Sequence, residues 1–250
     1  MKISIDIKHL IFITLGFVLF TIIGTVSHEY GHIIVAKTLG YETTLHYGSM
    51  NSYPKGYSND KDVIAFKNLT KDYVDVKYDS WPKEIKEKAE EYNEILEKRY
   101  WNEKSNDGLF ITIGGPLQTA LTGTIGLLIL IWRRKIICKN GMRTLDWLVV
   151  FLSLFWLREV FNLVTSFGGE LISPNGNWFG GDELHISQEL NLWSGTIPII
   201  LATLGIAVAI YVVFKIIPKK IRLTFILSGI IGGIMGFILW MNIIGPKILP

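Results

Sequence analysis

Five long apolar stretches constrain this chain more than any other feature of its sequence. A helix needs roughly 20 apolar residues to cross the hydrocarbon core of a bilayer, and each stretch has about that length. They cover residues 10–39, 109–132, 145–167, 196–217 and 223–244. Of the 250 residues, 49% are hydrophobic and only 19% are charged, which is ordinary for a polytopic membrane protein. We therefore expect an all-α polytopic membrane protein with about five transmembrane helices.

These stretches divide the chain into three parts. Residues 1–40 are expected to form the first transmembrane helix, and residues 41–108 a polar loop subdomain outside the membrane. Residues 109–250 carry the remaining helices, about four, which are interrupted by a polar loop at 168–194. Only the 41–108 segment is long enough to be a small polar subdomain.

The polar subdomain shows two local patterns. The alternation of apolar and polar residues at 73–76 predicts extended structure. Between 81 and 100, apolar residues recur every three to four positions, which predicts an amphipathic helix starting near Ser80 and Pro82. Such a helix can lie on the membrane, cover a site, or be an ordinary surface helix.

The charges are distributed unevenly although the net charge is only +3. The loop at 133–143 and the loop at 219–222 carry basic residues and no acidic ones, whereas 168–193 has acidic residues and neither Lys nor Arg. The positive-inside rule therefore places the N-terminus, with Lys2 and Lys8, in the cytoplasm, most simply at the plasma membrane. The loops 41–108 and 168–194 then face outward. The mixed charges of the first of these do not resemble a nucleic-acid footprint.

The single cysteine, Cys138, falls in a basic loop that we expect in the cytoplasm. One cysteine allows no disulfide framework, and we expect no nucleophilic role for it.

The first apolar stretch contains the motif His28-Glu29-Tyr30-Gly31-His32. Ionisable groups in such a place are costly unless something compensates them. On a helix, His28 and His32 lie one turn apart on one face, so both imidazoles can bind one metal ion, usually zinc (Zn²⁺). Glu29 on the neighbouring flank can then accept a proton from an activated water. The alternative is a pair of helix-interior histidines that hydrogen-bond to nearby backbone or hydroxyl groups.

A catalytic zinc usually has three protein ligands, and topology indicates where the third one lies. Residues 114–116 (Gly-Gly-Pro) and 180–185 should reach the same membrane face as the motif. We choose Asp182 as the third ligand because it follows two glycines, which let the backbone approach a crowded centre. Alternatively, Asp182 caps a helix that begins near Glu183. The competing ligands are His185, Glu183, Glu170 and Glu159.

Two neighbouring ionisable residues, Arg158 and Glu159, lie well inside the third apolar stretch. A functional role is the default expectation for such residues. Glu159 can hold a histidine ligand in the correct tautomer, or it can pair with Arg158. Asn162, one turn further on, can bind backbone or substrate.

The glycines of the apolar stretches also allow simple structural interpretations. The segment 114–116 can merely start a helix, with Pro116 in its first turn. Other glycines are expected to let neighbouring helices pack closely. They are Gly123, Gly126, Gly232, Gly233 and Gly236.

Taken together, the motif at 28–32, the Gly-Gly-Pro segment and Asp182 resemble the site-2 protease family of intramembrane zinc metallopeptidases. The resemblance covers roughly residues 21–185 without the polar loop. It implies a three-helix catalytic core, with His28, His32 and Asp182 as zinc ligands and Glu29 as general base. It also implies hydrolysis of peptide bonds, in a membrane protein or peptide substrate, within or beside the lipid bilayer.

The chain departs from the family pattern at three points. Thr119 stands three residues after the proline, where the family commonly has Asn, and Asn162 is far in sequence from Asp182. The family's site commonly opens toward the cytoplasm, whereas the charges here point it outward. We expect Thr119, Asn162 and Glu159 to lie beside the ligands.

Two other classes of function are compatible with the same residues. One is a catalytically silent, metal-binding membrane scaffold of the same family. The other is a transporter that uses His28, Glu29 and Glu159 as a polar path, which is disfavoured because the spans show no repeat. The sequence gives no indication of an oligomeric state.

Overall fold

The computed structural model describes residues 6–101, 105–174 and 176–249. Five helical segments are long and apolar enough to cross a membrane: Ile7–Thr38, Asp107–Asn140, Thr144–Ile172, Thr196–Ile216 and Lys219–Ile248. The prediction of an all-α polytopic membrane protein is therefore confirmed. Lys2, which contributed to the expected orientation, lies outside the described residues.

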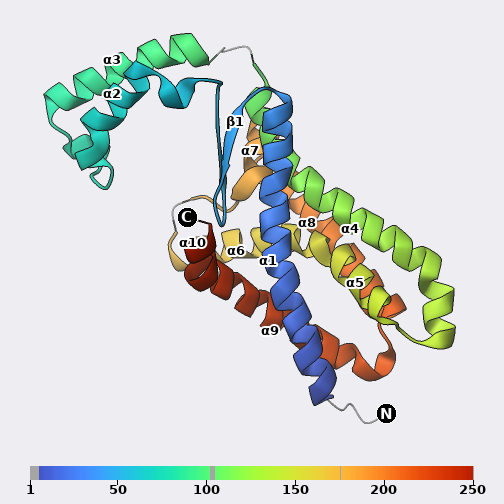
Figure 1. Cartoon of the computed structure of the whole chain (residues 1–250). Helices are drawn as coiled ribbons and strands as arrows, with labels where there is room; N and C mark the ends of the chain where they lie inside the picture. Colours follow the sequence, from blue (N-terminus) through green and yellow to red (C-terminus); the bar gives the residue numbers. More distant parts are fainter. Residues whose placement is uncertain (1–5, 102–104, 175, 250) are drawn as a thin grey trace.

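Helix α1 (Ile7–Thr38) is the axis of the molecule, and it packs against α4 (Asp107–Asn140) and α9 (Arg222–Leu239) (Figure 1). Small residues allow the close approach of α9: a Cβ at Gly232 would lie 2.5 Å from the Thr14 carbonyl oxygen. A Cβ at Gly236 would lie 3.0 Å from Val18 Cα. The expectation for Gly233 is wrong, because a Cβ there would have no atom within 4 Å.

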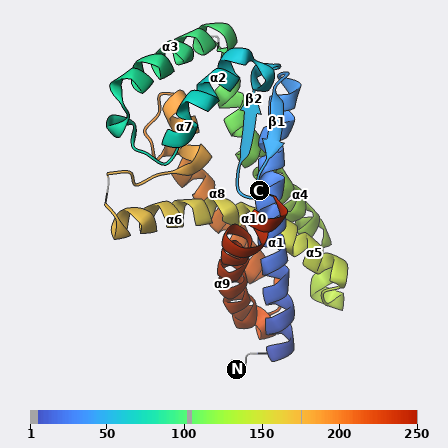
Figure 2. The same cartoon turned by 60° about the vertical axis from the view of Figure 1, so that its left-hand side comes forward.

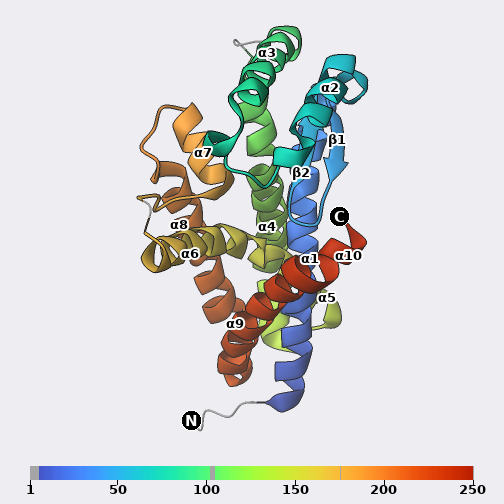
Figure 3. The same cartoon turned by 90° about the vertical axis from the view of Figure 1, so that its left-hand side faces the viewer.

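The third apolar segment is bent. Helix α5 (Thr144–Ser153) runs beside α4, and a 3₁₀ turn at Leu154–Trp156 separates it from α6 (Leu157–Ile172). Helix α6 then runs crosswise to α1 and α4 (Figures 2 and 3). Two glycines of α4 make room for the bend, because a Cβ at Gly123 would lie 2.5 Å from Trp156 Cδ1 and one at Gly126 2.5 Å from Ser153 N. The bend turns the start of α6 toward the centre of the molecule.

The remaining helices complete the bundle. Helix α8 (Thr196–Tyr211) packs on α6 and is extended by a π-helical segment, Val212–Ile216. Helix α9 continues through a second π-helical segment, Trp240–Ile244, into the short α10 (Gly245–Ile248). Aromatic rings fill the space between α1 and α5, where Phe20 stacks on Phe151.

The polar subdomain begins with an antiparallel hairpin of β1 (Glu42–Leu45) and β2 (Met50–Tyr53), in which Glu42 pairs with Tyr53. Two helices follow, α2 (Lys61–Thr70) and α3 (Lys83–Tyr100), and they project sideways from the upper end of α1 (Figure 1). The predicted amphipathic helix is confirmed.

Two local expectations for the polar subdomain are wrong. Ser80 does not start α3, because it belongs to a 3₁₀ turn, Tyr78–Ser80, and Pro82 immediately precedes the helix. The segment 73–76 is not extended: Tyr73 ends a 3₁₀ turn, Lys71–Tyr73, and a turn and a bend follow it. A short alternating run becomes a strand only when another strand pairs with it, and no described strand does so here.

The tip of the hairpin is fastened to the last helical segments. Trp240 Nε1 donates a hydrogen bond to the Tyr47 carbonyl oxygen at 2.6 Å, and Tyr47 N donates to the Leu249 carbonyl oxygen at 3.1 Å. Helix α7 (Gly181–Glu189) packs against α4 and α8, and its start lines the same cavity as the hairpin tip. The hairpin and α7 therefore lie at the same end of α1.

Candidate metal centre

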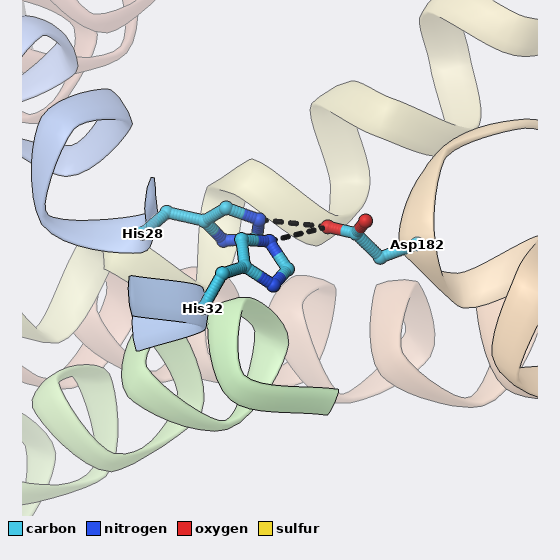
Figure 4. Close-up of side chains that lie close together, drawn as sticks. All are labelled: His28, His32 and Asp182. Carbon is cyan, nitrogen blue, oxygen red and sulfur yellow. Dashed lines mark hydrogen bonds and ion pairs between the residues drawn. The ribbon is translucent and has the colours of Figure 1, made fainter. Parts of the chain in front are cut away.

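The two motif histidines are buried side chains on one face of α1. Their ring centroids lie 4.9 Å apart, as expected for residues separated by one helical turn. Both Nε2 atoms point toward Oδ2 of Asp182, at 2.8 Å from His28 and 3.2 Å from His32 (Figure 4). These three residues form a group whose potential ligand atoms all lie within 4.8 Å of one another.

The second nitrogen of each imidazole is held by α4. His32 Nδ1 lies 2.7 Å from the Ile111 carbonyl oxygen, and His28 Nδ1 lies 3.0 Å from Thr119 Oγ1. A carbonyl oxygen can only accept, so Nδ1 of His32 is the donor. In the neutral ring Nε2 is then left with its lone pair, which is the form that binds a metal ion.

A backbone-to-backbone crossing of α1 and α4 makes these contacts possible. Gly31 faces Gly114, and a Cβ at Gly114 would lie only 2.6 Å from the Gly31 carbonyl oxygen. At Gly115 a Cβ would lie 2.5 Å from His28 Nε2 and would also overlap with His32 Nε2. Gly115 therefore keeps open the space that the two imidazoles face.

The Gly-Gly-Pro segment is not a helix start, so that interpretation is wrong. Helix α4 begins at Asp107 and continues through Pro116. Because Pro116 has no N–H, the Thr112 carbonyl oxygen loses its usual helical partner. Thr112 lines the cavity beside the histidines, so the missing bond lies next to the candidate centre.

Asp182 reaches the histidines from the first turn of α7. The helix begins at Gly181 with φ +75°, a conformation that favours glycine, and Gly180 occupies the cap position. The interpretation of Asp182 as the cap is therefore wrong. Burial alone raises the pKa of Asp182, but the imidazoles of His28 and His32 beside its Oδ2 outweigh burial and leave that pKa below its usual range. Asp182 is thus a carboxylate at neutral pH, as a metal ligand must be.

The competing ligands do not join this group among the described residues. Glu183 accepts a hydrogen bond from Asn162 Nδ2 at 2.9 Å, which ties α7 to α6. Glu170 accepts the Gly176 N–H at 2.8 Å and so holds the loop that precedes α7. His185 is exposed on the outer side of α7.

The structure separates the roles considered for the residues of α6. Glu159 is buried against Glu183, whereas the imidazole Nδ1 atoms are held by Thr119 and Ile111. Arg158 turns away from Glu159 and toward α1, where its Nη2 lies 3.9 Å from Glu29 Oε1. The pairing of Glu159 with Arg158 is therefore not found.

A cavity of about 410 Å³ opens beside the candidate centre. Its walls include Glu29, His32 and Asp182 on one side and Arg158 and Asn162 of α6 on another. The tip of the hairpin, residues 48–50, forms a further wall. No signal in the sequence pointed to these hairpin residues or to the Ile111 carbonyl oxygen.

A second, largely apolar cavity of about 650 Å³ adjoins the first. The two share Gly48, Arg158 and Asn162 among their lining residues. The apolar cavity continues along α1 between α6 and α9, where its walls are mainly aromatic and aliphatic. They include Phe17, Phe20, Phe155, Phe161, Ile230 and Phe237.

The donor set of the centre suits zinc. Two imidazole nitrogens and one carboxylate are ligands that zinc prefers, and three protein ligands are the usual number in a catalytic site. The space in front of Gly115 and the ionised state of Asp182 fit the same interpretation.

Comparisons with known proteins found no relative of this chain. No protein-family model, no curated protein and no solved structure matches the chain.

Proposed function

We propose that this protein is a zinc-dependent, membrane-embedded metallopeptidase, similar to the site-2 protease family, that hydrolyses peptide bonds in or near the bilayer. The observation that carries the proposal is the convergence of His28 Nε2 and His32 Nε2 on Asp182, with Glu29 in the wall of the adjoining cavity. Asp182 is about 150 residues from the motif in sequence, and yet its carboxylate lies against both imidazoles. Such a meeting of three potential ligands is not expected by chance.

His28, His32 and Asp182 would hold the zinc, which would supply a Lewis acid for a carbonyl oxygen and for a water molecule. The carboxylate of Glu29 accepts a proton from the attacking water. Once the C–N bond breaks, it gives that proton to the leaving amine nitrogen. Thr119 and the Ile111 carbonyl keep both imidazoles turned toward Asp182 during these steps.

The proposed substrate is an apolar peptide segment or a membrane protein. The apolar cavity has room for aromatic or aliphatic side chains, and it meets the polar cavity at Arg158 and Asn162. A substrate segment that occupies the apolar cavity would present its backbone beside Glu29. The bilayer is the natural source of such segments, because this cavity runs along the membrane-spanning part of α1.

In the orientation we propose, the N-terminus is cytoplasmic, the protein resides in the plasma membrane, and the centre faces outward. The expected basic loop at 133–143 is mostly helix, because α4 continues to Asn140. This basic segment and the one at 219–222 lie at the end of the molecule where α1 begins, whereas α7 and the hairpin lie at the other end (Figure 1). The positive-inside rule favours a cytoplasmic position for the basic end.

Zinc analysis and one substitution test the proposed function. Purified protein should contain close to one zinc per chain, and His28→Ala and His32→Ala should lose it. Glu29→Gln should keep the zinc but lose cleavage of a fluorescence-quenched apolar peptide. Unchanged cleavage in Glu29→Gln, or a wild-type protein that holds zinc but cleaves no peptide or protein, would instead favour a silent metal-binding scaffold. Wild-type protein without zinc would overturn the metal site itself.

A further inference from the structure

Arg158 is a cation without a close partner in the membrane-spanning part of the chain. Its Nε is buried and has no hydrogen-bond partner among the described residues. Within the described part of the chain its one ion pair is with Glu29, and the 3.9 Å between Nη2 and Oε1 is too long for a hydrogen bond. The side chain as a whole is 25% exposed, so only part of the guanidinium is withdrawn from solvent. An arginine in a membrane-spanning segment whose N–H groups lack a close partner points to a site for an anionic group.

Two other polar side chains that line the cavities at Arg158 already have partners. Thr119 Oγ1 contacts His28 Nδ1, and Asn162 Nδ2 donates to Glu183 Oε1. Both contacts hold elements of the centre in place, so neither group is free to turn toward a substrate. Arg158 is the charged donor that remains on the α6 wall, opposite the histidines and within reach of Glu29.

We propose that Arg158 is a catalytic residue that stabilises the negative charge developing on the scissile carbonyl oxygen. This inference rests on the proposed peptidase function. Arginine suits the task because its guanidinium stays charged and presents several N–H donors in a fixed plane. Its position at the junction of the two cavities is where the backbone of a peptide anchored in the apolar cavity would pass.

The step balances without a further reactant. The water oxygen forms a bond to the carbonyl carbon, its proton goes to Glu29, and the C=O electron pair moves onto the oxygen that Arg158 contacts. When the C=O bond re-forms, the C–N bond breaks and the amine nitrogen takes the proton from Glu29. The products are a carboxylic acid and an amine, and Arg158 returns to its starting state.

The test compares Arg158→Gln and Arg158→Lys with the wild type on the fluorescence-quenched apolar peptide. We expect kcat to fall by about 100- to 1,000-fold in Arg158→Gln, with KM changed little and zinc content unchanged. Arg158→Lys should recover part of the loss, because it restores the charge but not the planar set of donors. Arg134→Gln is the control, since it removes an exposed arginine at the basic end of the molecule.

A second readout does not depend on turnover. A peptide in which a phosphinate replaces the scissile amide carries the negative charge of the transition state. Its Kd, measured by calorimetry, should rise in Arg158→Gln by about the same factor by which kcat/KM falls. A neutral peptide of the same sequence should bind the inactive Glu29→Gln protein equally well with and without Arg158→Gln.

The outcomes separate this inference from the proposed function. A wild-type protein that binds zinc and cleaves the peptide, with kcat and phosphinate affinity unchanged in Arg158→Gln, would overturn the role of Arg158 alone. A rise in KM at constant kcat would also overturn it, because it would assign Arg158 to ground-state binding. If Arg158→Gln loses its zinc, Arg158→Lys decides, and a lysine variant with wild-type kcat and phosphinate affinity would count against the proposal.

Discussion

At the scale of single residues, the candidate centre depends on glycines as much as on its potential ligands. The imidazoles of His28 and His32 face a space that is open because residue 115 has no Cβ. The crossing of α1 and α4 is equally tight at Gly31 and Gly114. The motif therefore needs a glycine partner on a helix about 80 residues further along the chain.

Gly115→Ala should weaken zinc binding strongly. The added methyl group would lie 2.5 Å from His28 Nε2 and would overlap with His32 Nε2, so both rings must move. We expect the zinc affinity to fall by at least about 100-fold, the upper end of what is seen when the surroundings of ligands are disturbed. Competition with a fluorescent zinc chelator measures the change.

Gly108→Ala is the matched control for this substitution. It lies at the start of the same helix, and a Cβ there would meet no atom within 4 Å. It should bind zinc like the wild type. Equal zinc affinity in Gly115→Ala and the wild type would contradict the position of the centre.

At the scale of elements, the bend between α5 and α6 determines which residues surround the centre. It allows α6 to run crosswise, so that Arg158 and Asn162 reach the cavity walls. The same arrangement leaves the apolar cavity between α6 and α9, beside α1. The two cavities can therefore be tested separately by changes on different helices.

Gly233→Leu should impair activity without disturbing the metal. Gly233 lines the apolar cavity, and a Cβ there would meet no atom within 4 Å, so a leucine can enter the cavity without displacing backbone. We expect a rise in KM of about tenfold for the apolar peptide, comparable to the loss of one apolar contact in a binding pocket. Steady-state kinetics and zinc analysis provide the measurements.

Gly168→Leu is the control on α6. Its Cβ also has open space, but the residue lines neither cavity. If both variants raise KM equally, the apolar cavity is not where the peptide binds.

In the polar subdomain, hydrogen bonds that depend on pH connect the start of α2 to the end of α3. Asp60 accepts hydrogen bonds from Tyr100 Oη and Arg99 Nη1, both at 2.6 Å. These bonds, from Tyr100 first and Arg99 second, lower the pKa of Asp60 from 3.8 to about 2. Because the folded form favours the carboxylate, the stabilisation is complete above about pH 4 and is lost as the pH falls toward 2.

Pepsin cleavage between pH 4 and pH 2 measures this dependence. Cleavage within residues 61–100 should accelerate as the pH falls in the wild type, and Asp60→Asn should already be fast at pH 4. The ratio of the two rates removes the pH dependence of pepsin itself. Asp75→Asn, an exposed acid in the same subdomain, should follow the wild type, and a similar acceleration in this variant would count against the role of Asp60.

At the scale of the whole molecule, the candidate centre and the polar subdomain lie at one end and the basic segments 133–143 and 219–222 at the other. The motif, α7 and the hairpin come from three distant parts of the sequence and share the end opposite the N-terminus (Figure 1). This asymmetry makes the orientation in the membrane a question that surface labelling can answer.

Cys138, the natural cysteine of the chain, marks the proposed cytoplasmic side in a labelling experiment. Cys138 is exposed in the helix end that we propose to be cytoplasmic. A membrane-impermeant maleimide added to intact cells should leave it unlabelled. In a Cys138→Ser background, Asp75→Cys in the polar subdomain should react. Labelling of Cys138 but not of Asp75→Cys from outside would reverse the proposed orientation.

The sequence predicted the parts of this structure that depend on local patterns. Five apolar segments were found from their length and composition, and the spacing of His28 and His32 required only helical periodicity. Asp182 could be chosen as the third member of the group because topology and two glycines restricted the choice. The hairpin was missed because short strands form through pairing with a partner and not through local preference.

Other parts could not be predicted because they depend on packing between distant segments. The direction of Arg158 toward Glu29, and not toward its neighbour Glu159, follows from the bend at Leu154–Trp156. The segment Leu154–Trp156 contains no proline or glycine, so the sequence does not indicate a bend there. The partners of the imidazoles include a backbone carbonyl, that of Ile111, which no side-chain pattern can reveal.

The fastening of the hairpin by Trp240 also has a consequence for biosynthesis. Tyr47 and Trp240 are 193 residues apart, so the wall of the cavity at Gly48 is secured only after nearly the whole chain has entered the membrane. During insertion, the motif is made first, whereas Asp182 and then Trp240 arrive later. The nascent chain therefore lacks the third member of the candidate centre until α7 has been made, and it lacks a fastened cavity wall until the last helices dock.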